Sequence, residues 1–259
     1  MKAVIIGAGR GSRLQHQTDE IPKALVPVMG RPMLDWILDG FAAAGISRAN
    51  TVFVCGYAEE VVRQRYPDLT FVRNTEWEHN NVLASLLCAE AHFGDGFISS
   101  YADIVYEPAI LQRLLAAPED LVLGCDTKWR RRYVKRTQHP ETDAEKLSAS
   151  GRRVTLLSRR IPSEQADGEF IGVLKASPAG ARRLSQAYAH AKQRFAGGPY
   201  REGRTFERAY LIDLLAELLE SEVPLYRENT AGGYMELDTL EDLSLAEEWW
   251  TAFRQSQPA

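Results

Sequence analysis

Cysteine is scarce in this chain. Its 259 residues include only Cys55, Cys88 and Cys125, an odd number of thiols that lie far apart in apolar segments. Such spacing excludes a disulfide framework and a cysteine-ligated zinc site, and it suits buried, reduced thiols.

The chain also lacks excess positive charge and long apolar runs. Lysine and arginine number 31 against 35 acidic residues, so the net charge is −4 and no basic excess points to nucleic acid. No apolar run reaches the roughly 20 residues that span a bilayer, and the amino terminus has no signal-peptide pattern. We expect a cytoplasmic protein with no nucleic-acid or membrane partner.

What the sequence does contain is the composition of a globular protein. Hydrophobic residues make up 45% and charged residues 25% of the chain, and a chain of this length can bury one substantial core. The sequence has no internal repeat, low-complexity tract or interdomain linker. We therefore expect a single domain over residues 1–259.

Strand and helix patterns alternate through the first half. Apolar, β-branched runs predict strands at residues 2–6, 51–55, 69–72, 97–100 and 121–125. Helical spacing of apolar residues predicts helices at residues 32–44, 58–66, 82–92 and 108–116. This alternation predicts an α/β fold with a mainly parallel, mixed central sheet flanked by helices, which binds ligands at the carboxyl ends of its strands.

The second half is less regular. Residues 129–142 are polar and arginine-rich and show no clear period. Further patterns predict strands at residues 153–157, 169–175, 225–226 and 234–237, and helices at residues 177–194, at 206–219 and after Thr239. Capping residues mark two of these helix starts, at Ser177 and at Thr239.

A glycine-rich loop follows the first strand. It contains Gly7, Ala8, Gly9, Arg10, Gly11, Ser12 and Arg13, and Lys23 lies shortly beyond it. Such a loop lets backbone N–H groups approach phosphate oxygens, and the basic side chains add positive charge. These features suit a triphosphate and its charged transition state. A structural turn with surface arginines is the alternative.

Two better-known glycine loops do not match. A Walker loop ends in Gly-Lys-Ser/Thr, which Gly11-Ser12-Arg13 does not supply. A dinucleotide-binding fingerprint, G-x-G-x-x-G, runs directly into a helix, whereas here the third glycine comes one residue early and a polar stretch follows. The second strand ends in Gly56-Tyr57, with no acidic residue for a ribose. These differences argue against an NAD(P)-dependent oxidoreductase.

The motifs resemble those of the sugar-nucleotidyltransferase superfamily. Its loop carries Gly-x-Gly-x-Arg and then Pro-Lys, which this chain matches at Gly9, Gly11, Arg13, Pro22 and Lys23. Later segments resemble its choline-phosphate and phosphonate cytidylyltransferase branch: Asn80-Asn81-x-x-x-Ser85-Leu86, Tyr101-Ala102-Asp103-Ile104, Gly168-Glu169-Phe170-Ile171-Gly172 and Tyr234-Met235-Glu236-Leu237-Asp238. The resemblance covers nearly the whole chain. It implies a Rossmann-like nucleotidyltransferase fold, with a nucleotide-binding half at residues 1–126 and an acceptor-binding half at residues 127–259.

The resemblance also implies an activity. It points to a Mg²⁺-dependent enzyme that transfers CMP from CTP to a small acceptor of the phosphocholine or phosphonate type and releases pyrophosphate. A sugar-1-phosphate nucleotidylyltransferase on the same fold is the alternative. A non-catalytic nucleotide-binding regulator is a further class, which the intact Arg13, Lys23, Asp103 and Asp238 oppose. The implied partners are CTP and the acceptor, and a homodimer is compatible with the sequence.

The resemblance assigns the catalytic and metal-binding residues. Lys23 and Arg13 would contact the phosphates, and Asp103 matches the metal-binding aspartate of the superfamily. Mg²⁺ prefers one or two carboxylates, and Glu236 and Asp238 alternate on a late strand, so they share one face and would complete the metal site. Asp238 could instead cap the following helix, and Asp103 could be a turn residue.

One departure bears on this metal site. Many relatives carry two acids around the metal site, in the pattern Asp-x-Asp or Gly-Asp, whereas this chain has Tyr101 two residues before Asp103 and Ala102 directly before it. The further metal ligand must therefore come from Glu236 or Asp238.

Nucleotide contacts are implied for a larger set of residues. Asn80, Asn81 and Ser85 match a family segment that faces the base, although an asparagine there could equally cap the helix. Arg10 could equally be a solvated loop residue. The full set is Ala8, Gly9, Arg10, Gly11, Ser12, Asn80, Asn81 and Ser85.

The acceptor-binding residues are predicted from the second half. The candidates are Trp129, Lys146, Glu169 and Tyr234. An aromatic wall suits a quaternary ammonium, and Glu169 could neutralise a cationic head group or simply lie on a strand edge. Residues 130–132 are three arginines, which could bind an anionic acceptor or form a solvated face.

Overall fold

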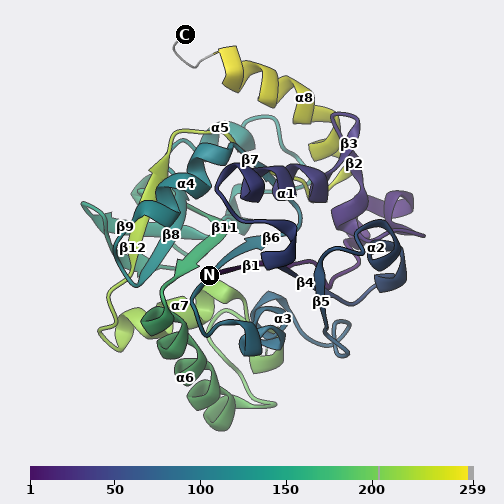
Figure 1. Cartoon of the computed structure of the whole chain (residues 1–259). Coiled ribbons are helices and arrows are strands. Elements are labelled where there is room, and N and C mark those ends of the chain that lie inside the picture. Colours follow the sequence, from purple (N-terminus) through teal and green to yellow (C-terminus); the bar gives the residue numbers. More distant parts are fainter. Residues whose placement is uncertain (204, 256–259) are drawn as a thin grey trace.

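One mixed sheet of nine strands runs through the molecule (Figure 1). The computed structural model describes residues 1–203 and 205–255. In sheet order the strands are β5 (Thr70–Arg73), β4 (Thr51–Cys55), β1 (Lys2–Ile6), β6 (Phe97–Tyr101), β11 (Gly168–Ala176), β8 (Leu121–Asp126), β12 (Tyr226–Thr230), β10 (Arg153–Leu157) and β9 (Lys146–Ser150). The central strands β4, β8 and β11 are buried along their whole length, because both faces of the sheet are covered.

Strand direction differs between the two halves of the sheet. β5, β4, β1 and β6 pair in parallel, as the alternation of strands and helices predicts. β11 then runs antiparallel to both β6 and β8, while β8 and β12 pair in parallel. β9 and β10 form an antiparallel hairpin, with Gly151 at φ +60° in the turn. The predicted α/β fold with a mixed sheet is confirmed, and its parallel pairing dominates only the first half.

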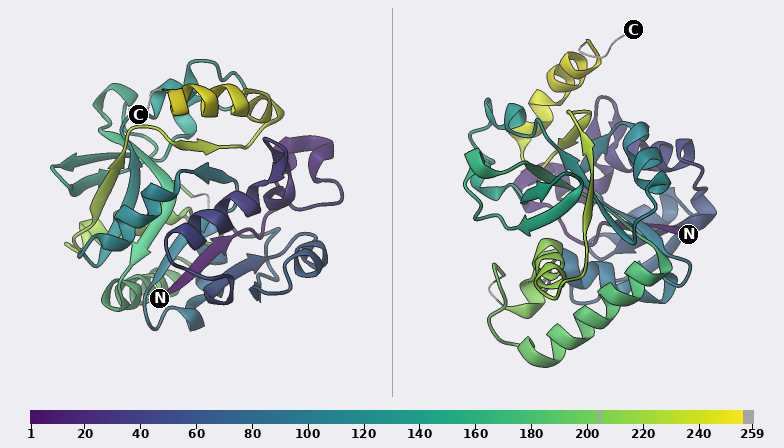
Figure 2. Two further views of the ribbon diagram at one scale, coloured as in Figure 1. Left: turned by 45° about the horizontal axis from the view of Figure 1, so that its top comes forward. Right: turned by 90° about the vertical axis from the view of Figure 1, so that its left-hand side faces the viewer.

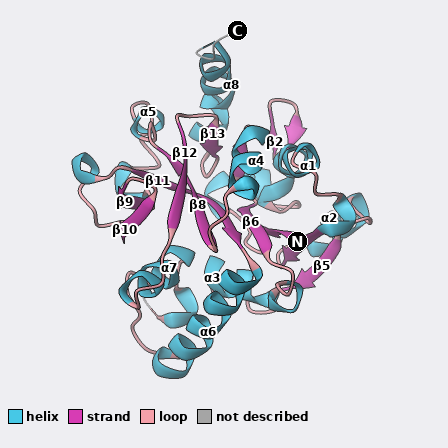
Figure 3. Ribbon diagram, turned by 60° about the vertical axis from the view of Figure 1, so that its left-hand side comes forward, coloured by secondary structure: helices cyan, strands magenta, loops and turns pink. Residues whose placement is uncertain are grey.

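Helices cover both faces of the sheet, and Figure 3 shows the magenta strands between two groups of cyan helices. One core cluster joins the sheet to α1 (Met33–Ala43), α2 (Glu59–Arg65) and α4 (Pro108–Ala116). The opposite cluster joins it to α3 (Val82–Cys88), α6 (Pro178–Phe195) and α7 (Leu211–Glu220). None of the helices within residues 1–203 and 205–255 has the length and hydropathy needed to cross a membrane.

A third, smaller core ties the end of the chain to the amino-terminal loop. Helix α8 (Leu240–Gln255) lies on the side of the molecule opposite α6 and α7 (Figure 2). Its Ala246 and Trp250 pack with Leu14 and with the short hairpin of β2 (Pro27–Val28) and β3 (Arg31–Pro32). Burial of one such large apolar side chain contributes roughly 1.5–3 kcal/mol. This core holds in place the strand that precedes α8.

That preceding strand completes the site. β13 (Tyr234–Glu236) pairs antiparallel with β7 (Ile104–Tyr106), and the Leu237 N–H donates a hydrogen bond to the Asp103 carbonyl oxygen at 2.9 Å. Two segments that are distant in sequence therefore lie side by side. As a result, Asp103, which follows β6, lies close to Glu236 at the end of β13 and to Asp238 just beyond it, at one edge of the main sheet.

The structure corrects several predicted element boundaries. The predicted helix at 82–92 ends at Cys88, and a 3₁₀ turn, Glu90–His92, follows it. The predicted helix at 206–219 begins instead at Leu211, because the Asp213 carboxylate accepts the Tyr210 N–H at 2.8 Å and so caps α7 there. Strands β7 and β9 were not predicted, since β7 has three residues and β9 has a weakly apolar sequence. The irregular stretch at 129–142 contains one short helix, α5 (Arg130–Tyr133).

Candidate active site

The glycine-rich loop leaves the carboxyl end of β1 and packs closely on its neighbours. A Cβ atom on Gly7 would lie 2.4 Å from Phe53 Cζ, and one on Gly11 would lie 2.8 Å from the Lys23 Cβ. Gly11 also has φ +75°, a left-handed conformation that L-residues rarely adopt. A Cβ on Gly9 would meet nothing within 4 Å, so the loop backbone there faces open space. The loop therefore supports the Lys23 side chain and leaves its own backbone accessible.

We expect Gly11→Ala to lower the free energy of unfolding by about 2–4 kcal/mol, measured by urea denaturation. The left-handed φ contributes roughly 1–2 kcal/mol of this cost, and the clash with Lys23 contributes the rest. Gly30→Ala is the matched control, because Gly30 has φ +77° but open space around it. The close packing of Gly11 on Lys23 would be contradicted if the two variants were equally stable.

Lys23 is the centre of a network of ion pairs. Its Nζ lies 2.7 Å from Asp103 Oδ2 and also contacts Asp238 Oδ1. The guanidinium of Arg13 lies 2.6 Å from Asp238 Oδ2. Lys23 and Asp238 are buried, whereas the side chain of Arg13 is 53% exposed. The structure thus brings together four residues that the sequence analysis placed in one site.

This network fixes the charges at its centre. Burial alone would raise the pKa of Asp238, but Lys23 and Arg13 outweigh burial and hold that pKa well below its ordinary value. Burial alone would lower the pKa of Lys23, but Asp103 and Asp238 outweigh burial and raise it. Both residues are therefore charged at neutral pH, which gives the site a permanent ammonium.

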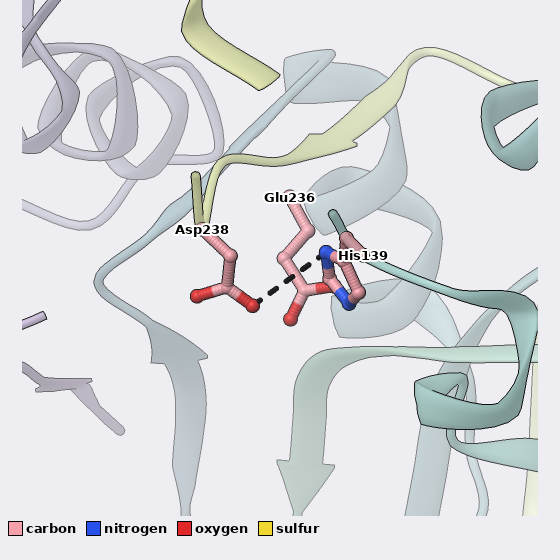
Figure 4. A group of neighbouring side chains, drawn as sticks. All are labelled: His139, Glu236 and Asp238. Carbon is pink, nitrogen blue, oxygen red and sulfur yellow. Dashed lines mark ion pairs between the residues drawn. The ribbon is translucent and has the colours of Figure 1, made fainter. Parts of the chain in front are cut away.

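His139, Glu236 and Asp238 form a cluster beside this network (Figure 4). One donor atom from each lies within 4.8 Å of the others. His139 Nε2 is 3.6 Å from Glu236 Oε2, and His139 Nδ1 is 3.7 Å from Asp238 Oδ2. Burial, followed by the charge of Asp238, raises the pKa of Glu236 to about 7. The cluster therefore combines one imidazole with two carboxylates in different electrostatic environments.

His139 lies in the arginine-rich stretch and could not be identified from the sequence. Buried contacts hold this stretch in place: Arg136 Nε lies 2.8 Å from Asp242 Oδ1, and Arg136 Nη2 donates to the Glu236 carbonyl oxygen at 2.6 Å. Asp242 also accepts the N–H groups of Asp238 and Thr239, each at 2.9 Å. The stretch has no periodicity, so its sequence gave no signal that a histidine in it reaches the acids of β13.

A cavity of about 520 Å³ opens in front of these groups. A second hollow of about 420 Å³ continues along the glycine-rich loop and is lined by Gly7, Gly9, Gly11, Ser12, Lys23 and Arg208, among others. Both are lined by Arg13, Asn81, Asp103 and Asp238. They therefore form one continuous space, which we call the cleft, with the ion-pair network at the junction of its two parts.

The predicted nucleotide-binding residues divide into two groups. Ala8 and Gly9 line the larger cavity, and Gly11 and Ser12 line the smaller hollow. Arg10 lines neither: its guanidinium lies 2.8 Å from Asp19 Oδ1 and 5.4 Å from the centre of the Tyr57 ring. The geometry therefore agrees with the solvated alternative for Arg10.

Asn80, Asn81 and Ser85 line the larger cavity at the start of α3. The buried Asn74, which the sequence analysis missed, donates to Asn80 Oδ1 at 2.8 Å and to Ser85 Oγ at 2.9 Å. Asn81 Oδ1 accepts the Val82 N–H at 2.9 Å and so caps α3. Asn81 therefore both caps α3 and lines the cavity. Contact of Asn80, Asn81 and Ser85 with a base stays a prediction.

Two of the predicted acceptor residues, Glu169 and Tyr234, line the larger cavity. Glu169 accepts a hydrogen bond from the Tyr133 hydroxyl at 2.7 Å and pairs with Arg132. The Arg132 guanidinium lies 4.4 Å from the centre of the Tyr234 ring. Glu169 is therefore neutralised by a buried arginine, which leaves less of its charge for an acceptor.

Trp129 and Lys146 do not line the cleft. Trp129 is 2% exposed and packs edge-on against the Tyr133 ring at 5.6 Å. Lys146 Nζ donates to the Glu141 carbonyl oxygen at 3.3 Å, and burial lowers the pKa of Lys146. In this geometry either residue could affect an acceptor only through its neighbours.

Four further residues of the cavity wall were not predicted from the sequence. The Tyr101 hydroxyl donates to Glu145 Oε2 at 3.1 Å. Arg159 lies 3.1 Å from Asp143 Oδ1, and its guanidinium covers the Tyr210 ring at 4.7 Å. Tyr101, Glu145, Arg159 and Tyr210 all line the larger cavity. Tyr101 belongs to the segment Tyr101-Ala102-Asp103-Ile104 but was given no role there. Glu145, Arg159 and Tyr210 belong to no motif, and β9, which directly follows Glu145, was itself not predicted.

Glu145 provides a prediction about pH. Burial, followed by the charge of Glu236, raises its pKa from 4.5 to about 8. The folded protein therefore binds more protons than the unfolded chain between these values, and its unfolding free energy falls as the pH rises through that window. Glu145→Gln removes this titration, so we expect its stability relative to wild type to increase by roughly 3–5 kcal/mol from pH 4.5 to pH 8. Urea unfolding at several pH values measures this.

The control for that series is Glu164→Gln, because Glu164 is exposed and lies outside the lining of the cleft. Its stability should follow that of wild type at every pH. A Glu145→Gln curve parallel to wild type would contradict the raised pKa.

The carboxylates of Asp103, Glu236 and Asp238 also offer ligands for a divalent cation. Asp103 Oδ1 is buried and has no hydrogen-bond partner among the described residues. Such an orphaned carboxylate oxygen is costly unless a ligand satisfies it. Together with Glu236 and Asp238 it supplies the oxygen donors that Mg²⁺ prefers. The residues of this site therefore fit a divalent cation.

The sequence of this chain is similar to a known domain family and to several known enzymes. Residues 3–149 match the model of the MobA-like NTP transferase domain. The CTP:phosphoglutamine cytidylyltransferase of Campylobacter jejuni is 27% identical over 255 residues, which cover 95% of this chain and 98% of the relative. The CMP-5'-(3-aminopropyl)phosphonate synthase of Streptomyces rubellomurinus is 36% identical over 125 residues, which cover 46% of this chain and 20% of that protein.

Solved structures agree with the fold. The CTP:phosphocholine cytidylyltransferase of Streptococcus pneumoniae superposes with a TM-score of 0.71 at 19% identity, covering 95% of this chain and 97% of that one. The inositol-1-phosphate CTP transferase of T. maritima superposes with a TM-score of 0.73 at 19% identity, covering 100% and 98% of the two chains. At this level of identity the likeness establishes a shared fold.

Proposed function

The chain belongs to the MobA-like NTP transferase family, and from this premise we propose that it is a cytidylyltransferase that moves CMP from CTP to a small phosphorylated or phosphonylated acceptor. The resemblance to nucleotidyltransferases seen in the sequence is thereby confirmed. One observation carries the proposal: the Lys23 ammonium is held by Asp103 and Asp238 at the junction of the cleft. The relative from Campylobacter jejuni, which matches almost the whole chain, supports CTP as the nucleotide.

The proposed reaction follows from the charges of the site. An oxygen of the acceptor's phosphate or phosphonate attacks the α-phosphorus of CTP, the bond from that phosphorus to the β-phosphate breaks, and pyrophosphate leaves. Both reactants are anions, so the site must offset charge and hold the two in line. Lys23 would contact the reacting phosphate, and Arg13 with the backbone of the glycine-rich loop would hold the leaving phosphates.

We assign Mg²⁺ to Asp103, Glu236 and Asp238. When bound there, the cation would neutralise phosphate charge. Lys23 and Arg13 already pair with Asp103 and Asp238, so Glu236, whose pKa of about 7 a bound cation would lower, would supply most of the free carboxylate charge.

We propose a division of labour between the two halves of the chain. Residues 1–126 supply the glycine-rich loop, Lys23, Asp103 and the start of α3, so this half would bind the nucleotide. Residues 127–259 supply Glu145, Arg159, Glu169 and Tyr234, so this half would bind the acceptor. The cytoplasmic location and a homodimer stay predictions.

Charge on the cavity wall favours an acceptor that carries an amine. Among the described residues, six carboxylates line the larger cavity against two guanidiniums, those of Arg13 and Arg159. The carboxylates belong to Asp103, Asp143, Glu145, Glu169, Glu236 and Asp238. Glu145, whose pKa is raised to about 8, is mostly protonated in the free site, and an ammonium on the acceptor would favour its ionised form and pair with it.

Pyrophosphate release tests the proposal. We would assay CTP, UTP, GTP, ATP and dTTP against phosphocholine, 2-aminoethylphosphonate, ethylphosphonate and glucose 1-phosphate. We expect CTP to be preferred, and the amine-bearing acceptor to exceed ethylphosphonate in kcat/KM by about tenfold or more, the size of one charge-assisted contact. A preference for glucose 1-phosphate with UTP or dTTP would establish the sugar branch instead, and no release with any pair would overturn the proposed transfer.

A further inference from the structure

His139 has no role in the reaction proposed above, yet it faces the carboxylates of Glu236, at the end of β13, and of Asp238, two residues beyond that strand (Figure 4). Its side chain is 3% exposed. Nε2 lies 3.6 Å from Glu236 Oε2, and Nδ1 lies 3.7 Å from both Asp238 Oδ2 and Asp242 Oδ2. Both ring nitrogens are thus turned toward acids.

These contacts leave the imidazole unsatisfied. Separations of 3.6 and 3.7 Å are too long for hydrogen bonds. Nδ1 is buried and has no hydrogen-bond partner among the described residues. A buried polar atom without a partner costs free energy, and an imidazole nitrogen is a common ligand of transition metals. The geometry therefore calls for a group that binds between the ring and the acids.

The separations suit a cation. Two ligands that each lie about 2.0–2.1 Å from one ion are at most about 4.2 Å apart. The contact of His139 Nε2 with Glu236, at 3.6 Å, and that of Nδ1 with Asp238, at 3.7 Å, each fall within that limit, although a ring binds one ion through only one of these nitrogens. One donor atom from each of the three residues lies within 4.8 Å of the others, so a small side-chain adjustment would bring all three around one ion. Direct nitrogen–oxygen hydrogen bonds would be shorter, near 2.9 Å. A cation between one ring nitrogen and a carboxylate oxygen thus fits a spacing that is too long for a hydrogen bond.

We propose that His139 is a nitrogen ligand of the divalent cation bound at Glu236 and Asp238, and that the site favours first-row transition cations such as Mn²⁺ or Co²⁺ over Mg²⁺. The inference rests on the metal-dependent transfer proposed above and adds both a ligand and a metal preference. A purely oxygen-lined site suits Mg²⁺, whereas imidazole binds it poorly. One histidine in the site therefore shifts its selectivity.

Pulsed electron paramagnetic resonance of bound Mn²⁺ tests this without any turnover. We would use the full chain, without acceptor, in the absence and in the presence of CTP. Wild-type protein should show coupling of the Mn²⁺ electron spin to a directly bound ¹⁴N nucleus in at least one of the two states. His139→Gln should lose that coupling, and Mn²⁺ should bind at least about tenfold more weakly, since even indirect supports of a metal site are worth 10–100-fold in affinity.

Two controls make the result specific. His190→Gln should keep the coupling and the affinity, because His190 is exposed on α6 and does not line the cleft. Wild-type protein labelled with ¹⁵N-histidine should exchange the ¹⁴N coupling for a ¹⁵N coupling, which tests for a histidine ligand without any substitution. Mg²⁺ affinity, measured by competition, should change by less than about threefold in His139→Gln, because a nitrogen ligand contributes little to Mg²⁺ binding.

Either of two outcomes would overturn the proposal: bound Mn²⁺ without histidine coupling, or no Mn²⁺ binding at millimolar concentration with or without CTP. The proposed function fails separately. Pyrophosphate release with CTP but no nitrogen coupling removes only the ligand assignment. Coupling without any transfer leaves the metal site in place and removes the reaction.

Discussion

Lys23→Ala should lower kcat by about 100- to 1000-fold while the KM for CTP changes only a few-fold. The ammonium is buried and held by Asp103 and Asp238, so it is in place before the substrate arrives. Negative charge on the reacting phosphate shifts as the acceptor attacks, and a preorganised cation acts mainly in that transition state. Removal of one such contact commonly costs ~3–4 kcal/mol in the activation free energy. Steady-state kinetics with the preferred nucleotide and acceptor measure both constants.

The matched control for Lys23→Ala is Arg10→Ala. Arg10 belongs to the same loop, but its guanidinium pairs with the exposed Asp19 and does not line the cleft. This variant should keep kcat within about threefold of wild type. Urea unfolding of Lys23→Ala checks that loss of the buried cation has not unfolded the protein. An effect of Lys23→Ala confined to KM would mean that the ammonium binds ground state and transition state equally.

Asp103→Asn should lower turnover by about 100-fold or more, and excess Mg²⁺ or Mn²⁺ should not restore it. The substitution keeps the volume of the side chain but removes the charge that pairs with Lys23 at 2.7 Å. It also replaces a half-buried carboxylate, whose buried Oδ1 has no hydrogen-bond partner among the described residues. The rate should fall because both the cation site and the position of the ammonium depend on that charge.

Asp19→Asn is the control for this second change, since Asp19 is exposed and pairs only with Arg10 among the ion pairs of the described residues. It should leave the rate within about threefold of wild type. Activity of Asp103→Asn at that same level, at saturating metal, would show that the cation is held elsewhere. Circular dichroism of the two asparagine variants should be identical.

The centre of the site could be predicted from the sequence because short motifs determine it. The glycine-rich loop follows the first strand and Asp103 follows the fourth predicted strand, and parallel neighbours place both at one edge of the sheet. Glu236 ends β13 and Asp238 lies two residues beyond it, and the expected strand alternation correctly placed the two side chains near each other. Local pattern and strand direction were sufficient for these residues.

The wall of the cavity could not be predicted in the same way. His139 reaches the acids because Arg136 and Asp242 pair across a long sequence separation, and no local pattern encodes that contact. Glu145 and Arg159 flank the hairpin of β9 and β10, and β9 has too little apolar character to be recognised. Trp129 was expected beside the acceptor because it follows a central strand, but its buried ring packs edge-on against Tyr133 and does not line the cleft. Side chains on irregular segments depend on tertiary contacts that sequence periodicity does not report.

The position of β13 near the end of the chain also sets an order of events during protein synthesis. Asp238 lies 215 residues after Lys23, the residue it contacts. At roughly 5–20 residues per second, a ribosome needs about 10–40 s to make the chain between them. Throughout that interval the lysine can meet Asp103, but Asp238 and the anchoring helix α8 do not yet exist. A growing chain can thus fold its first strands early, while the ability to react with a nucleotide arrives only with the final segment.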